Sequence, residues 1–173
     1  MSLAYRLRQF WRLIRAQPLP EKAWTTIEAM LSPAELALFR QQTVGDRAHA
    51  YRVLLTLQEE GEDDRCLLAA ALLHDVGKCR MKTTILDRVM GTVGQRLFPR
   101  RAAAWGKTTG RGWHRPFVIR RQHALLGATM AEQAGSEATT VRLIRHHQDS
   151  PQVMKDAKER HLLERLQWAD DQN

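Results

Sequence analysis

The sequence predicts an all-α fold, a compact bundle of about seven or eight helices in a single domain over residues 1–173. Apolar residues recur at spacings of three and four along most of the chain, as they do in amphipathic helices. No stretch shows the alternation of apolar and polar residues that is typical of half-buried strands. The 173 residues suffice for one substantial core, and neither an internal repeat nor a domain linker interrupts them.

The first predicted helices lie in an N-terminal helical extension over residues 1–31. Residues 2–16 place Leu3, Leu7 and Phe10 on one face of a helix and arginines elsewhere. We expect this apolar face to pack on the domain, the alternative being peripheral contact with an anionic membrane surface. Residues 17–20 contain two prolines that break the helix, and a second helix is expected over residues 21–31.

The next two helices are predicted from capping residues. Ser32 can cap a helix whose first turn holds Pro33, and Glu35 completes a capping box. We expect this helix to end near Gly45. Asp46 opens the following helix, either as its N-cap or as a partner that orients a histidine one turn later.

The second half of the chain is expected to hold a long basic loop between helices. A helix over residues 81–97 is interrupted or ends around Gly91 and Gly94. Residues 99–116 are rich in Gly, Arg, Thr and Trp and lack apolar periodicity, so we expect a basic loop or lid there. His114 is an ordinary residue of that loop or, alternatively, a substrate contact. Further helices are expected over residues 115–134, 137–148 and 153–171.

An apolar helix near the middle of the chain ends in His74 and Asp75. The run LLAAALLHDVGK at residues 67–78 is apolar at helical spacing, so the pair is expected to border the core. A buried carboxylate without a partner costs several kcal/mol. A divalent cation would satisfy both groups, because an imidazole nitrogen and a carboxylate oxygen suit zinc, iron or manganese. The alternative is a capped and solvated pair at the helix end.

The motifs around this pair resemble the HD superfamily of metal-dependent phosphohydrolases. DRAHAYRVLLTL at residues 46–57 is similar to the family's first-histidine helix, ALLHDVGK to its His-Asp motif, and LQWADDQN at residues 166–173 to its closing-aspartate helix. HALLGA and RHHQ are similar to extra histidine motifs in HD proteins that bind two metals. The resemblance covers roughly residues 31–171 and implies an HD-domain-like helical fold.

The resemblance also implies a centre for one or two divalent ions of iron, manganese, zinc, cobalt or magnesium. Asp75 would belong to a first metal site and bridge to a second. Consecutive helical residues point about 100° apart, so His146 and His147 need not both be ligands. The implied ligands are His49, His74, Asp75 and Asp170 at the first site, and Asp75, His123 and one or both of His146 and His147 at the second.

The implied function is hydrolysis of a phosphate ester or anhydride of a nucleotide or similar small molecule by a metal-activated water. Asp75 and Lys78 are the implied catalytic residues, and Lys78, Arg120 and Arg121 are candidates to bind the phosphate. HHQDSPQ lacks the glycines and tyrosine of the HD-GYP cyclic-dinucleotide phosphodiesterases, so small stand-alone HD hydrolases are the closer resemblance. The alternatives are a non-catalytic metal-binding module that senses nucleotide or nucleic acid, and a di-iron oxygenase.

The distribution of charge agrees with an anionic small-molecule substrate. Residues 80–121 hold eleven Lys and Arg against one acid, Asp87, whereas the whole chain has a net charge of +8. A focused positive field beside a metal site favours an anion such as a nucleotide and speeds its encounter; the alternative partner is nucleic acid.

Cysteine use and hydropathy favour a cytoplasmic protein. Cys66 and Cys79 form neither a C-x-x-C pair nor a disulfide framework. No apolar stretch reaches the roughly eighteen residues that a membrane-spanning helix needs, and no secretory signal is recognisable at the amino terminus. The sequence lacks the P-loop motif G-x-x-x-x-G-K-[ST], the dinucleotide-binding motif G-x-G-x-x-G, the serine-hydrolase motif G-x-S-x-G and the metalloprotease motif H-E-x-x-H.

Overall fold

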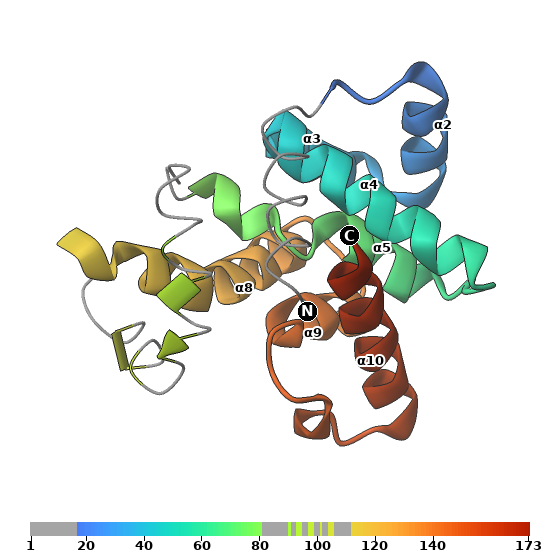
Figure 1. Cartoon of the computed structure of the whole chain (residues 1–173). Helices are drawn as coiled ribbons and strands as arrows, with labels where there is room; N and C mark the ends of the chain where they lie inside the picture. The colour runs from blue at the N-terminus through green and yellow to red at the C-terminus, as the bar shows by residue number, and fades with distance from the viewer. Residues whose placement is uncertain are drawn as a thin grey trace.

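The computed structural model describes residues 17–80 and 112–173, together with residues 90, 93, 94, 97, 98, 101, 104 and 105 between them. This part of the chain contains seven α-helices, three short 3-10 helices and no strand (Figure 1). The predicted all-α class is confirmed. The helix expected over residues 2–16, most of that expected over 81–97 and most of the loop at 99–116 lie outside the described residues.

The longest described helices are α4, α8 and α10, with 16, 19 and 16 residues. Among the described residues, no helix is both long and apolar enough to cross a bilayer. In chain order the elements are α2 (Glu21–Met30), α3 (Pro33–Gln41), α4 (Val44–Glu59), α5 (Arg65–Leu73), η1 (Val76–Arg80), η2 (Gly112–His114), α8 (Arg115–Gln133), α9 (Ala138–His146), η3 (Pro151–Val153) and α10 (Ala157–Gln172).

The helix α3 begins at the predicted capping box but ends earlier than expected. The Ser32 hydroxyl accepts a hydrogen bond from the Glu35 N–H, and the Glu35 carboxylate accepts one from the Ser32 N–H. The helix ends at residue 41, and Gly45 lies inside the first turn of α4. Thr43 caps α4, because its hydroxyl oxygen accepts from the N–H of Asp46. The interpretation of Asp46 as the N-cap was therefore wrong.

The last helix also begins later than predicted. The prediction extended it from residue 153, but α10 starts at Ala157. Asp156 caps it by accepting a hydrogen bond from the Glu159 N–H at 2.9 Å. Pro151 starts the separate 3-10 helix η3 before it, in the first turn where a proline is best tolerated.

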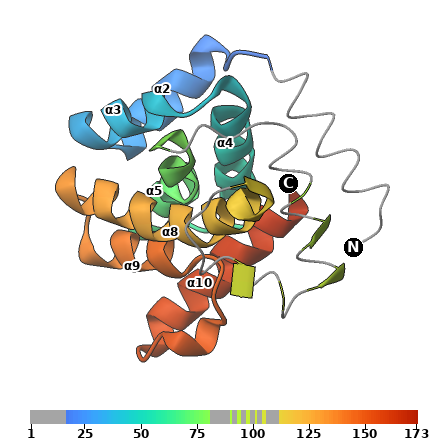
Figure 2. The ribbon, with the colours of Figure 1, turned by 90° about the vertical axis from the view of Figure 1, so that its left-hand side faces the viewer.

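The core surrounds α5, which lies in the interior in both views (Figures 1 and 2). All residues from Leu67 to Leu73 are buried. The helix packs against α2, α3, α4, α9 and α10, so an apolar side chain on any of its faces meets another helix. Asp64 starts α5 by accepting hydrogen bonds from the N–H groups of Cys66 and Leu67. The buried end of this helix leads directly into His74 and Asp75.

Candidate metal centre

Five separate elements bring histidine and aspartate side chains to the C-terminal end of α5. The side chains form two groups, and in each group ligand atoms lie within 4.8 Å of one another. The first group is His49 of α4, His74 after α5, and Asp170 of α10; the second is Asp75, His123 of α8, and His147 at the end of α9.

A close contact between two backbones fixes the position of the His-Asp turn. A Cβ atom on Gly77 would lie 2.0 Å from the carbonyl oxygen of His123 and 2.6 Å from the nitrogen of Gly127. Contacts of that length do not occur for real Cβ atoms, so η1 can approach α8 this closely only with glycine at position 77. The glycine therefore holds Asp75 beside the histidine of α8.

The first group has one direct hydrogen bond. The Nε2 atom of His49 lies 2.8 Å from Oδ1 of Asp170, and the Nε2 atom of His74 lies 3.7 Å from the same oxygen. The imidazole rings of His49 and His74 meet edge to face with centroids 5.5 Å apart. These three side chains therefore direct their nitrogen and oxygen atoms into one small space.

The second group adjoins the first through Asp75. Its Oδ2 atom lies 3.5 Å from Nε2 of His74, and its Oδ1 atom lies 3.3 Å from Nε2 of His123 and 3.9 Å from Nε2 of His147. The Nε2 atoms of His123 and His147 are 3.2 Å apart. Each carboxylate oxygen of Asp75 thus faces a different group, which is the arrangement a bridging ligand requires.

Backbone contacts fix the tautomers of two of the histidines. Nδ1 of His74 lies 2.9 Å from the carbonyl oxygen of Ala71, and Nδ1 of His147 lies 2.7 Å from that of Ile144. A carbonyl oxygen only accepts, so in each ring Nδ1 carries the proton and Nε2 presents a lone pair. Nε2 of His74 is buried and has no hydrogen-bond partner. A buried lone pair without a donor, among carboxylates and imidazoles, fits a metal ion.

The carboxylates of the centre are held in the charged form. Burial alone would raise the pKa of Asp75, but the Lys78 ammonium, the adjacent His74 imidazole and a hydrogen bond with His123 hold it well below its usual value. The Lys78 ammonium contacts Oδ2 of Asp75 directly. Partial burial likewise opposes ionisation of Asp170, yet the hydrogen bond with His49 and the neighbouring imidazoles of His74 and His49 lower its pKa. Both carboxylates are therefore ready to bind a cation.

The histidine His147 is held in the neutral form. Burial, with the neighbouring imidazoles of His123 and His74, lowers its pKa from 6.5 to about 3, and the charge of Asp75 offsets this only in part. A neutral imidazole is the form that binds a metal.

The neighbouring His146 lies outside both groups. Its Nδ1 atom is 2.8 Å from Oδ2 of Asp149, and its side chain is 30% exposed.

Sequence reasoning did not single out Gln148, whose amide nitrogen lies 3.3 Å from Nε2 of His123. Its position directly after the histidine pair was the available signal. The side chains of Arg120 and Arg121, the other candidates for phosphate binding, lie outside the described residues.

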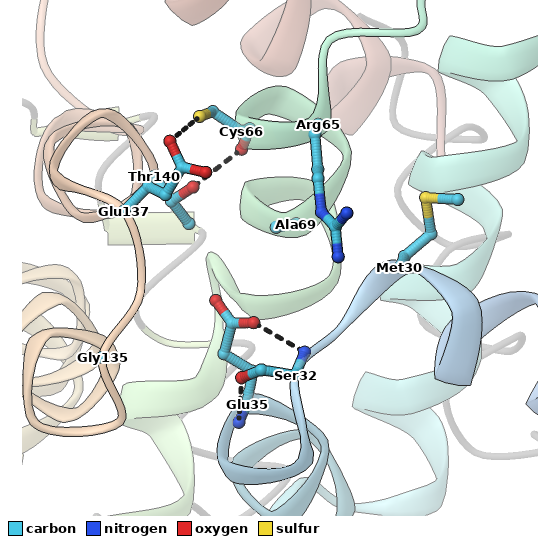
Figure 3. Close-up of a pocket in the computed structure, with 9 residues that line it drawn as sticks. All are labelled: Met30, Ser32, Glu35, Arg65, Cys66, Ala69, Gly135, Glu137 and Thr140. Carbon is cyan, nitrogen blue, oxygen red and sulfur yellow. Dashed lines mark hydrogen bonds between the residues drawn. The ribbon is translucent and has the colours of Figure 1, made fainter.

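The described residues also form a cavity of about 190 Å³ (Figure 3). It is formed by the turn between α2 and α3, the first turns of α5, and the turn between α8 and α9. The thiol of Cys66 and the carboxylate of Glu137 meet beside it at 3.4 Å, and burial raises the pKa of that thiol. None of the residues of the two histidine and aspartate groups lines this cavity.

Comparison with known proteins agrees with this geometry. The family model of the HD domain matches residues 47–171, a span that contains all six side chains of the two groups. Searches of curated proteins and of solved structures gave no match. HD domains make up a superfamily of the metal-dependent phosphohydrolase type, and they bind divalent metals. Because the match covers most of the sequence, the chain belongs to the HD domain family.

Proposed function

We propose that this chain is a metal-dependent phosphohydrolase that cleaves a phosphate ester or anhydride of a nucleotide or similar small molecule. The observation that carries the proposal is the lone pair on Nε2 of His74, buried without a hydrogen-bond partner at the junction of the two groups. Membership of the HD domain family, a superfamily of the metal-dependent phosphohydrolase type, supports this reaction class.

The two groups are the proposed metal ligands. His49, His74 and Asp170 would hold one ion, His123 and His147 a second, and Asp75 has an oxygen toward each. Nitrogen and oxygen donors in this mixture suit zinc, iron, manganese or cobalt. Such ions, when bound, neutralise phosphate charge and lower the pKa of a water molecule.

The chain supplies a positively charged group for the substrate. The Lys78 side chain is 28% exposed and places its ammonium on Asp75. We propose that it turns from this carboxylate to an oxygen of the phosphate, which it can bind as a point charge. Arg120 and Arg121 stay candidates for the same task, and their position on α8 two or three residues before His123 favours them.

Two adjacent histidines offer a matched test of the proposal. We expect His147→Gln to abolish metal-dependent phosphate release and to weaken binding of the second ion, because it removes a buried nitrogen of the centre. His146→Gln should retain both, because that side chain contacts Asp149 outside the two groups. The assay is phosphate release from a panel of nucleotides and phosphodiesters with manganese, cobalt, ferrous iron or zinc, each against a chelator control.

The outcomes separate the alternatives. Hydrolysis that needs a divalent ion and survives only in His146→Gln supports the proposal. Tight metal and nucleotide binding without turnover on any substrate would make the chain a sensing module. Consumption of dioxygen with ferrous iron, and no phosphate release, would make it an oxygenase.

A further inference from the structure

An aromatic cluster lies at the N-terminal end of α8 and belongs to neither metal group. We define it by Trp105, Trp113, His114 and Phe117. The ring centroid of Trp105 lies 4.7 Å from that of Trp113 and 4.9 Å from that of Phe117. The ring centroids of Trp113 and His114 are 4.0 Å apart. Phe117 is buried at 5% exposure, whereas Trp113 is 54% exposed. Phe117 thus anchors the cluster in the protein, and Trp113 presents its indole ring to solvent.

The cluster lies within the most basic part of the sequence. Residues 80–121 carry eleven Lys and Arg and one acid. Nearby in this segment the Arg101 guanidinium lies over the Phe98 ring at 6.0 Å, and Phe98 is 50% exposed. Exposed aromatic rings among arginines are suited to bind nucleotides, because every base has a flat π face that can stack on a ring, and the phosphate attached through the sugar is attracted to the arginines.

The helix α8 links the cluster to the metal centre. Phe117 and His123 are six residues apart on this helix, which corresponds to a rise of about 9 Å along its axis. A phosphate at the centre and a base on the cluster would therefore be bound along the same helix.

We propose that the aromatic cluster is a stacking subsite for the base of a nucleotide whose phosphate is bound at the metal centre, with Trp113 as the residue that contacts the base. This inference rests on the proposed phosphohydrolase function and deepens it, because it restricts the substrate to phosphates that carry an aromatic base. Stacking of one base changes affinity by roughly ten- to a hundredfold when the ring is removed.

The test compares Trp113→Leu, which removes the ring, with Trp113→Phe, which keeps one. Substrates are used in pairs that differ only by the nucleoside or base: ATP with tripolyphosphate, and AMP with ribose 5-phosphate. We expect Trp113→Leu to reduce kcat/KM for the base-bearing member roughly ten- to a hundredfold, Trp113→Phe to restore most of it, and the baseless member to be unaffected. Leu125→Ala, which alters another exposed apolar side chain of α8, should change neither.

A loss that is equal for both members of each pair, or no loss, would overturn the stacking subsite and leave the hydrolase intact. If no substrate is hydrolysed, the same variants are compared by equilibrium binding of ATP and tripolyphosphate to the metal-loaded protein. Weaker binding of ATP alone in Trp113→Leu would then keep the subsite while the proposed hydrolase fails. Tight binding of single-stranded RNA with no binding of mononucleotides would assign the cluster to nucleic acid and overturn the inference.

Discussion

Replacing Gly77 with alanine is expected to disrupt the metal centre through a backbone contact, without altering any ligand. The added Cβ atom would lie 2.0 Å from the carbonyl oxygen of His123, and real Cβ contacts essentially never fall below 3.0 Å. The 3-10 helix η1 and the helix α8 must therefore separate by at least about 1 Å, the difference between these two distances. Neither neighbour can yield by changing a rotamer, because both clashing groups are backbone.

The displacement is about a third of the 3.3 Å that separates His123 from Asp75. Nε2 of His123 is 3.3 Å from Oδ1 of Asp75, and the latter lies on the turn that η1 continues. We expect the free energy of unfolding to fall by about 1–3 kcal/mol, the usual effect of overpacking a well-packed contact. Activity should fall by on the order of a hundredfold, because a misplacement of about 1 Å has that effect on a preorganised site.

The matched control is Gly61→Ala in the turn after α4. Gly61 has a φ of +82° and nothing within 4 Å of its Cβ position, so alanine there introduces backbone strain of about 1–2 kcal/mol without a contact. Urea unfolding in chelator and calorimetric titration with manganese measure both variants. We expect both to lose stability and only Gly77→Ala to lose metal affinity. Wild-type metal affinity in Gly77→Ala would refute the reasoning.

Two further predictions concern the titratable groups of the centre, His147 and Lys78. The metal-free protein should lose stability as the pH falls from 6.5 toward 3, because unfolded His147 takes up a proton near 6.5 and folded His147 only near 3. Urea midpoints at several pH values should show this slope, and His147→Gln should flatten it; an equal slope in the variant would contradict the assignment. Lys78→Met should destabilise the metal-free protein by about 1–3 kcal/mol, because it removes a partner of the buried Asp75 carboxylate. Saturating metal should reduce that difference, and a difference of the same size with metal bound would contradict a cation site at Asp75.

Local sequence signals predicted the helices better than their ends. The apolar run before His74 and the Ser32 capping box depend on residues within a few positions of one another, and both were predicted. The start of α4 was assigned to the wrong residue, because Thr43 and Asp46 are both good capping residues. In the structure the Thr43 hydroxyl accepts a hydrogen bond from the Asp46 N–H and donates one to the Asp46 carboxylate. Both residues therefore contribute to the helix start.

The convergence of the centre could not be derived from spacing alone. His49 and Asp170 form a hydrogen bond across 121 positions of sequence, and only the family resemblance indicated that they would meet. The choice between His146 and His147 depends on how α9 ends. His147 follows the last helical residue and turns inward because its Nδ1 donates to the carbonyl of Ile144. No pattern within the sequence specifies that rotation.

The most direct test of the central claim is the anomalous difference density of crystals of the full chain grown with zinc or manganese. The account predicts a peak at bonding distance, about 2.0–2.1 Å for zinc, from Nε2 of His74, with Asp75 and Asp170 bound to the same ion. Peaks confined to other residues, with the lone pair of His74 left without a metal at saturating concentrations, would contradict it.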